Sequence, residues 1–125
     1  MSILHRFNKQ LLNFLIELKD IFPEIKKINY YINSIELILK INPKKIPQNF
    51  GRNVYQYKNK IFDEDITFFL ESKEFKNDME LKGSNIFSEV IFYKDIWNNE
   101  LSDTTKKAIW RYLKILIKLY EKISF

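Results

Sequence analysis

Residues 25–39 read IKKINYYINSIELIL, and in this stretch isoleucine or leucine recurs alternately every three and every four residues. The recurring positions are Ile25, Ile28, Ile32, Ile35 and Leu39. This spacing places the side chains on one face of an α-helix, so we predict an amphipathic helix here. Pro23 stands just before the stretch, near the favoured first turn of a helix, and Asn42-Pro43 ends it.

Two further stretches show the same spacing, one on the N-terminal side of this helix and one near the C-terminus. The first consists of Leu4, Phe7, Leu11, Phe14 or Leu15, Leu18 and Phe22, and the second of Ile109, Leu113, Leu116, Tyr120 and Ile123. Pro23 ends the first helix, because a residue that precedes proline is pushed out of the helical region. The second begins at about Asp103, with Ser102 or Asp103 as its N-cap.

The middle of the chain is less regular. We predict a helix from Pro47 to Phe62, although Gly51 weakens it by roughly 1 kcal/mol relative to alanine. A short helix over residues 66–70 follows the acidic run 63–65, and residues 72–85 are expected to form a loop with a turn at Gly83-Ser84. Asn85 is expected to cap a helix from Ile86 to about Asn99, whose buried face contains Ile86, Val90, Tyr93 and Trp97. The expected fold is all-α: one compact domain over residues 1–125, with five or six helices in an orthogonal or irregular bundle.

Length and composition limit the classes of function. The chain has 125 residues, of which 46 % are hydrophobic, enough for one buried core. It has no cysteine, which excludes disulfides, thiolate catalysis and Cys-ligated metals, and its only histidine, His5, has no ligand partner three or four residues away. The chain has neither an apolar stretch of membrane-spanning length nor a signal peptide. We expect an intracellular, non-secreted, non-membrane protein that is not an enzyme and uses no metal or cofactor.

Charge is distributed in three segments. Residues 1–62 carry 11 Lys/Arg and 4 Asp/Glu, residues 63–103 carry 4 and 11, and residues 104–125 carry 6 and 1, for net charges of +7, −7 and +5. The acidic middle either covers the basic ends in the fold or leaves two opposed faces, one acidic and one basic. Its carboxylates include Asp63, Glu64 and Asp65, which sit before a predicted helix and stabilise its N-terminus, so they need no metal or acid–base role.

A basic and aromatic run suggests nucleic-acid binding as one function. The cationic side chains are Lys40, Lys44, Lys45, Arg52, Lys58 and Lys60, and Phe50, Tyr55 and Tyr57 lie between them. Lysines that neutralise phosphates, together with aromatic rings on which bases stack, hold nucleic acids without reading their sequence. The alternative is that the aromatic residues belong to the core and that the lysines are solvated. The chain has 18 lysines against three arginines, a ratio that A/T-rich codons explain without selection for binding.

Large aromatic residues suggest protein–protein interaction as the other function. Trp97 and Trp110 flank one expected turn between helices, and an exposed Trp110 would be an interaction hot spot, whereas a buried one belongs to the core. The predicted helices also carry apolar residues off their main stripes, which are Leu12, Ile16, Ile21, Tyr31, Leu37, Ile38, Ile117 and Leu119. A helix that is apolar over more than half of its circumference is central or is covered by a partner. The leading hypothesis is therefore a non-enzymatic module that binds another protein or itself, with Trp97, Trp110, Tyr112 and Tyr31 as contact residues.

The chain also resembles a family of short proteins encoded by nucleocytoplasmic large DNA viruses. The resemblance rests on Phe7-Asn8, Gln10-Leu11, Phe14-Leu15, Leu18, Phe22-Pro23, Asn42-Pro43, Tyr55-x-Tyr57, Asp65, Phe68-Phe69-Leu70, Trp97, Leu101-Ser102, Lys107, Ile109-Trp110, Tyr112-Leu113 and Leu116. It implies an all-helical viral protein that acts in the infected cell, the viral factory or the virion. These motifs are structural, and the resemblance assigns no activity and no catalytic residue.

Overall fold

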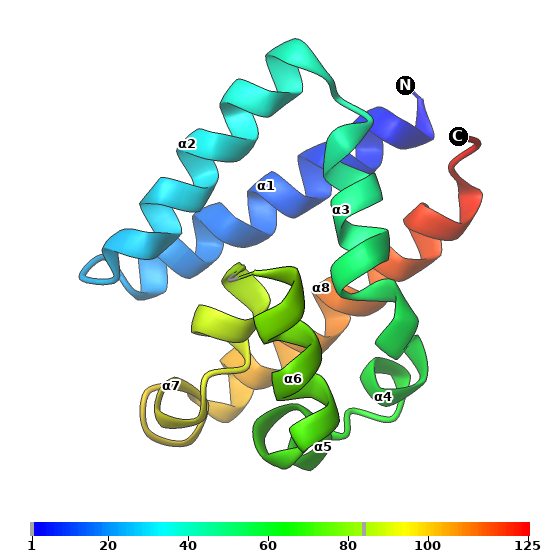
Figure 1. Ribbon diagram of the computed structural model, residues 1–125. Coiled ribbons are helices and arrows are strands. Elements are labelled where there is room, and N and C mark those ends of the chain that lie inside the picture. Colours follow the sequence, from blue (N-terminus) through cyan, green and yellow to red (C-terminus); the bar gives the residue numbers. More distant parts are fainter. Residues whose placement is uncertain (1, 84) are drawn as a thin grey trace.

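The three helices predicted from apolar spacing are the longest elements of the computed structural model, which describes residues 2–83 and 85–125 (Figure 1). They are α1 (Ile3–Ile21), α2 (Lys26–Ile41) and α8 (Asp103–Lys122). The hydroxyl oxygen of Ser2 accepts a hydrogen bond from the backbone N–H of His5 and caps α1. Ser102 caps α8 in the same way, because its hydroxyl accepts the N–H of Thr105 at 3.1 Å. The prediction of these three helices is confirmed.

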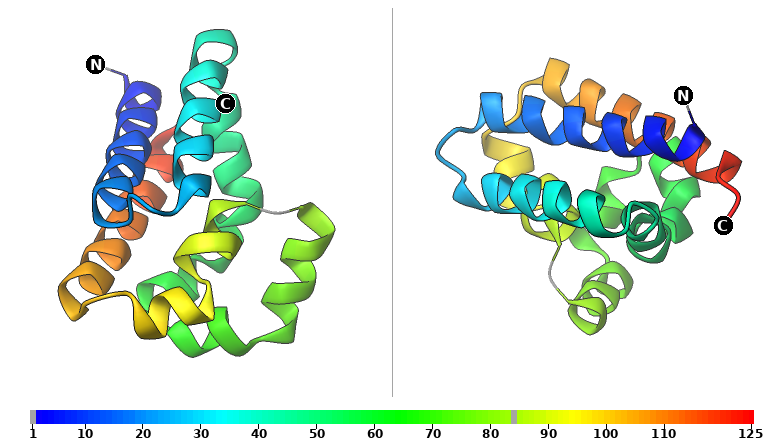
Figure 2. Two further views of the ribbon diagram at one scale, coloured as in Figure 1. Left: turned by 90° about the vertical axis from the view of Figure 1, so that its left-hand side faces the viewer. Right: turned by 90° about the horizontal axis from the view of Figure 1, so that it is seen from above.

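The pair α1 and α8 forms the centre of the molecule. The two helices lie side by side and antiparallel, so the two chain ends lie at the same end of the molecule (Figures 1 and 2). The fully buried side chains of α8 include Leu113, Leu116 and Ile117, and they pack among the buried apolar residues of α1. Helix α8 is central and buried over a wide arc. This burial explains why Ile117, which lies off the main apolar stripe, is apolar.

The predicted helix over residues 47–62 is broken into three pieces. They are α3 (Lys45–Asn53), the 3-10 turn η1 (Tyr55–Tyr57) and α4 (Lys58–Phe62). The break allows α3 to pack on α1 and α2 while α4 packs on α8. A straight helix would reach only one of these two sites, and the expectation of a single helix was therefore wrong.

Residues 72–85 were expected to form a loop, but most of them are helical. After α5 (Ile66–Glu71), capped by the Asp65 carboxylate, comes α6 (Lys73–Lys82), capped by the Ser72 hydroxyl. Only Phe75 and Met79 of α6 are buried, one turn apart, and this pair is enough to hold a helix that is otherwise polar. Gly83, with a backbone φ of 86°, ends α6, and Ser84 of the predicted turn lies outside the described residues.

The helix predicted over residues 86–99 is also interrupted. Asn85 does act as a cap, since its side-chain oxygen accepts the N–H groups of Phe87 and Ser88. A π-helical turn, η2 (Phe87–Ile91), follows, and α7 (Lys94–Asn99) begins after it. The wider turn closes with a hydrogen bond from the Phe92 N–H to the Phe87 carbonyl, which adds one residue to the turn. Phe92 therefore occupies the core position that we predicted for Tyr93, which is half exposed.

The all-α prediction is correct, but the number of helices is not. Within residues 2–83 and 85–125 there are eight α-helices and the two short turns η1 and η2, rather than five or six helices. The additional elements lie between α3 and α8: α4, α5 and α7 have five or six residues each and α6 has ten, and these helices occupy the lower part of Figure 1. The described portion contains no helix that is both long and apolar enough to cross a membrane.

Candidate interaction surface on α2

Helix α2 carries two apolar seams. The inner seam is the predicted stripe: Ile28 and Ile32 are buried, Ile35 and Leu39 are half-buried, and all four pack into the core. The outer seam consists of Tyr30, Ser34, Leu37 and Ile41, spaced by four, three and four residues. Leu37 is the one residue of this seam that we predicted as an off-stripe apolar position, although Tyr30, Leu37 and Ile41 also have the spacing of one row along a helix.

The outer seam faces away from the core. Tyr30, Leu37 and Ile41 retain 67 %, 61 % and 78 % of their accessible surface. Helix α2 forms an edge of the molecule in Figure 1 and faces the viewer beside α1 in the left view of Figure 2. Leucine and isoleucine repeated at helical spacing on an open face are typical of a helix that binds another helix.

A pocket of about 290 Å³ opens along one flank of the outer seam; we call it the α2–α3 pocket. Its apolar lining includes Ile35 and Ile38 of α2, Ile46 and Phe50 of α3, and Ile86 and Phe87 before and in η2. Polar side chains also line it, namely Tyr30, Tyr31, Ser34, Asn49, Asn53 and Asn85. Among residues 2–83 and 85–125, none of those that line the pocket is charged, although 30 % of the chain is charged. It is therefore suited to an apolar group.

Tyr31, one of the predicted contact residues, lies in the wall of this pocket and is half-buried. Its hydroxyl donates to Glu89 Oε1 at 3.1 Å, and Lys27 Nζ lies 2.8 Å from the other oxygen of Glu89. Burial, followed by the negative charge of Glu89, raises the pKa of Tyr31 to about 12. The tyrosine is thus a fixed wall of the pocket that joins α2 to η2.

Cationic residues occupy the opposite flank and the C-terminal end of the outer seam. Lys26, Asn33 and Lys40 follow one another at intervals of seven residues, and Lys44 and Lys45 come directly after Ile41 and the turn. All four lysines are exposed, and within residues 2–83 and 85–125 none of them forms an ion pair. We call Lys26, Lys40, Lys44 and Lys45 the lysine flank.

The rest of the predicted nucleic-acid run is separated from the lysine flank. Arg52 is exposed near the end of α3, whereas Lys58 and Lys60 of α4 lie 3.4 Å from Glu121 and 3.5 Å from Asp65. A hydrogen bond with Tyr55, together with Glu121, raises the pKa of Lys58. The interleaved Phe50 and Tyr57 are buried, as in the core alternative. The fold therefore divides the run into the α2–α3 corner, the end of α3 and a paired segment on α4.

The two tryptophans are core residues. Trp97 and Trp110 contact each other with ring centroids 5.5 Å apart, and they pack on Phe92, which in turn stacks on Phe69 at 4.0 Å. Each retains 5 % or less of its accessible surface, so neither presents a contact surface in this fold. Between the two roles weighed for Trp110, burial supports the core role. The reason is that α7 folds back so that its tryptophan covers the start of α8.

Tyr112 is half-buried and joins α8 to α1. Its ring stacks on Phe14 with centroids 4.9 Å apart. Burial, followed by the nearby carboxylate of Glu17 on α1, raises its pKa to about 12. These contacts give Tyr112 a structural role between two helices, away from the outer seam of α2.

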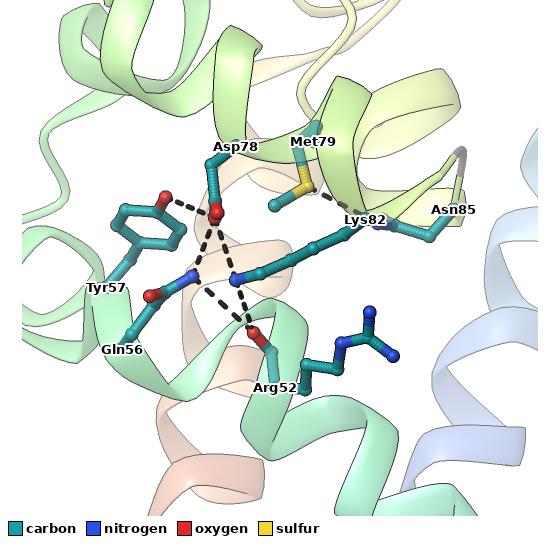
Figure 3. A network of polar contacts seen from close by, with 7 residues as sticks. All are labelled: Arg52, Gln56, Tyr57, Asp78, Met79, Lys82 and Asn85. Atoms are coloured by element: carbon teal, nitrogen blue, oxygen red, sulfur yellow. Dashed lines mark hydrogen bonds and ion pairs between the residues drawn. The ribbon is translucent and has the colours of Figure 1, made fainter.

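The densest polar network lies elsewhere and fastens α6 to the α3–η1 segment (Figure 3). Asp78 Oδ2 accepts hydrogen bonds from Tyr57 at 2.6 Å, Gln56 at 2.7 Å and Lys82 at 2.9 Å, and Lys82 also donates to the Arg52 carbonyl. Burial by itself would raise the pKa of Asp78, but the hydrogen bonds from Tyr57, Lys82 and Gln56 outweigh it and lower that pKa. Because these donors all converge on one carboxylate oxygen, the network is suited to holding α6 rather than to catalysis.

Three further acidic residues have a cap or ion-pair role. Asp65 caps α5, Glu64 pairs with Lys114, and Glu71 lies 2.7 Å from Lys94. In the part of the chain that the structure describes, no three His, Asp or Glu side chains gather in a group that could hold a metal ion. His5 is exposed at the start of α1.

Comparison with known proteins adds no family assignment. No protein-family model, no curated protein and no solved structure matches this chain. The candidate surface therefore rests on the geometry of α2 and its surroundings.

Proposed function

We propose that this chain is a non-enzymatic interaction protein that binds a helix of another protein along the outer seam of α2. The observation that carries the proposal is the exposure of Tyr30, Leu37 and Ile41 in one row along a helix whose opposite face is part of the core. In agreement with the sequence resemblance, we propose that it is a viral protein that acts inside the infected cell or in the virion.

The energetics favour this surface over the other exposed apolar residues. Covering Leu37 and Ile41 would contribute about 1.5–3 kcal/mol for each side chain. Because α2 is already fixed against the core through Ile28 and Ile32, binding does not require the helix itself to fold, which keeps the entropic cost low. Leu81 on α6 is more exposed, at 87 %, but it is the only exposed large apolar residue among the described residues of that helix.

The test uses position-specific photo-crosslinking in infected cells. A photoreactive amino acid replaces Leu37 in one sample and Leu81 in a matched control, and crosslinked proteins are identified by mass spectrometry. We expect a protein that crosslinks through position 37 and not through position 81, and that is lost when Ile41→Glu is added. The circular dichroism spectrum and melting temperature of each variant check that the fold is intact.

Three outcomes would contradict the proposal. One is the same set of crosslinked proteins at positions 37 and 81, and another is no crosslink at position 37. The third is loss of the position-37 crosslink after nuclease treatment, which would favour nucleic-acid binding, the alternative suggested by Lys40, Lys44 and Lys45.

A further inference from the structure

We infer that the partner helix carries glutamate or aspartate along the side that meets the lysine flank and places one large apolar side chain in the α2–α3 pocket. This inference rests on the proposed function, and it specifies the chemistry of the partner. The charge of the lysine flank and the neutral lining of the pocket carry it independently of each other.

The register of α2 places lysines beside the outer seam. If Ser34 and Ile41 are the a positions of a heptad and Tyr30 and Leu37 the d positions, then Lys26, Asn33 and Lys40 are the g positions. Residues at g contact the flanking residues of the facing helix and select its charge. Two of the three g positions are lysines, and Lys44 and Lys45 extend the positive charge beyond the end of the seam. Acidic residues on the partner are the complement.

Ion pairs within the described residues do not neutralise the lysine flank. Glu36 is the only acidic residue of α2; it stands one turn before Lys40, but within the described residues the two side chains form no ion pair. The acidic segment 63–103 supplies partners to other lysines, such as Glu89 to Lys27 and Asp65 to Lys60. The lysine flank receives no such partner within the described residues. Its charge is therefore available to a ligand.

A second copy of this chain is a poor occupant of the outer seam. An antiparallel pair of outer seams brings Lys26 of each copy towards Lys44 and Lys45 of the other. In a parallel pair, the g positions of one copy face the e positions of the other, which within α2 are Tyr31 and Ile38, so the lysines gain no acidic partner. Like charges that face each other across a helix pair oppose association. Pairing of this surface with the same surface of a second copy is therefore disfavoured.

On the other flank of the outer seam, Tyr31 and Ile38 occupy the e positions and line the α2–α3 pocket. The pocket is about 290 Å³ in volume, and its floor contains Ile46 and Phe50. Because the described side chains that line the pocket are all uncharged, a charged group entering it would lose hydration without gaining a charged partner among them. A leucine, methionine or aromatic side chain from the partner is the group that fits.

The test compares two designed helical peptides by fluorescence anisotropy. Both carry leucine and isoleucine at the seam positions and one phenylalanine for the pocket, and they differ only in having glutamate or lysine along the flank. We expect the glutamate peptide to bind at least tenfold more tightly at 50 mM salt, with a smaller advantage at 200 mM salt. The triple variant K40E/K44E/K45E should reverse this preference.

A charge-matched variant provides the control. The substitutions Lys73→Glu, Lys76→Glu and Lys118→Glu remove the same charge from exposed positions on α6 and α8, and they should preserve the preference for the glutamate peptide. Filling the pocket with Ile38→Trp should weaken binding of the glutamate peptide at least fivefold. The melting temperature of each variant is measured in parallel, so that a loss of folding is recognised.

Several results would overturn the inference. They are equal binding of both peptides, tighter binding of the lysine peptide, no binding of either, or a dimer in sedimentation that Leu37→Glu abolishes. Binding of a DNA duplex that the K40E/K44E/K45E variant loses, without peptide binding, would assign the lysine flank to nucleic acid. If crosslinking at position 37 succeeds while the peptides show no preference, only this inference fails. If crosslinking itself fails, the proposed function fails first.

Discussion

Gly51 lies where α3 meets α8, and the ring of Tyr120 occupies the space that a side chain would need. A Cβ at position 51 would lie 2.2 Å from the Tyr120 hydroxyl oxygen and 2.6 Å from Cζ. The ring is held in place by Tyr55, at a centroid distance of 4.6 Å, and by Phe50, at 6.0 Å. The sequence shows only the cost of a glycine in a helix; the close approach of Tyr120 explains why that cost is tolerated.

We therefore expect Gly51→Ala to lower the free energy of unfolding by about 1–3 kcal/mol, because the displaced ring strains its neighbours. This loss exceeds the roughly 1 kcal/mol that alanine gains in helix propensity. The measurement is urea unfolding followed by circular dichroism. In a Tyr120→Ala background, where the obstruction is gone, Gly51→Ala should instead be stabilising. An equal effect in both backgrounds would contradict the role of Tyr120.

At the scale of the element, α2 offers a comparison between its two seams within one helix. Ile32 belongs to the inner seam and is buried, whereas Leu37 belongs to the outer seam and is mostly exposed. We expect Ile32→Ala to lower the free energy of unfolding by about 2–4 kcal/mol, because it leaves a cavity in the core. Leu37→Ala should change the free energy of unfolding by less than about 0.5 kcal/mol.

Binding should respond in the opposite order. Leu37→Ala should weaken binding of the partner or of the glutamate peptide, whereas Ile32→Ala should leave that affinity unchanged under conditions where the protein is folded. Chemical unfolding and anisotropy, measured on the same two variants, give both quantities. A large loss of stability from Leu37→Ala would show that the outer seam is part of the fold and not a binding face.

The long helices could be predicted from the sequence because their apolar spacing repeats over four or five turns. Caps were equally readable where a short polar side chain preceded such a repeat, as at Ser102 and Asn85. By contrast, α6 buries only Phe75 and Met79, which is too short a pattern to distinguish a helix from a loop. Phe92 occupies the core position predicted for Tyr93 because the π turn contains one extra residue. The apolar periodicity of the sequence does not indicate that extra residue.

The candidate site could be predicted only in part. Tyr31 and the cationic residues Lys40, Lys44 and Lys45 were identified from residue type and spacing, and they lie at two edges of the outer seam. Tyr30 and Ile41 were missed: their spacing with Leu37 marks a row along the helix, but it does not show whether that row is buried or exposed. For the same reason, the sequence left the role of Trp110 open between contact and core.

Considered as a whole, the molecule uses its acidic middle to neutralise part of its basic ends. The pairs Lys27–Glu89, Lys60–Asp65 and Lys114–Glu64 each join a basic segment to residues 63–103. Exposed pairs of this kind contribute little to stability individually. Their main consequence is electrostatic, because they pair other lysines and leave the lysine flank without an ion pair beside the apolar outer seam. A partner can then be attracted by apolar contact and selected by its charge.

The Asp78 network ties α6 to the α3–η1 segment (Figure 3). Because the network depends on the charge of Asp78, we expect the free energy of unfolding of the whole molecule to depend on pH. Hydrogen bonds lower the pKa of this carboxyl in the folded state below the value of about 3.9 expected in the unfolded chain. A lowered folded-state pKa means that Asp78 contributes stability above the unfolded pKa, and that this contribution is lost as the pH falls towards the folded pKa.

We therefore expect Asp78→Asn to lower the free energy of unfolding by about 1–2 kcal/mol at pH 7, because charge-assisted hydrogen bonds from Tyr57 and Lys82 become neutral ones. The difference between the two proteins should narrow as the pH falls below about 4, because Asp78 then takes up a proton in the unfolded wild-type chain, whereas its lowered pKa keeps it charged in the folded protein. Urea unfolding of both proteins at a series of pH values from 7 to 3 measures this difference in the free energy of unfolding. Asp20→Asn, an exposed change on α1, gives the baseline for removing one surface charge. A difference that stays constant down to pH 3 would show that the network does not fasten α6 through the charge of Asp78.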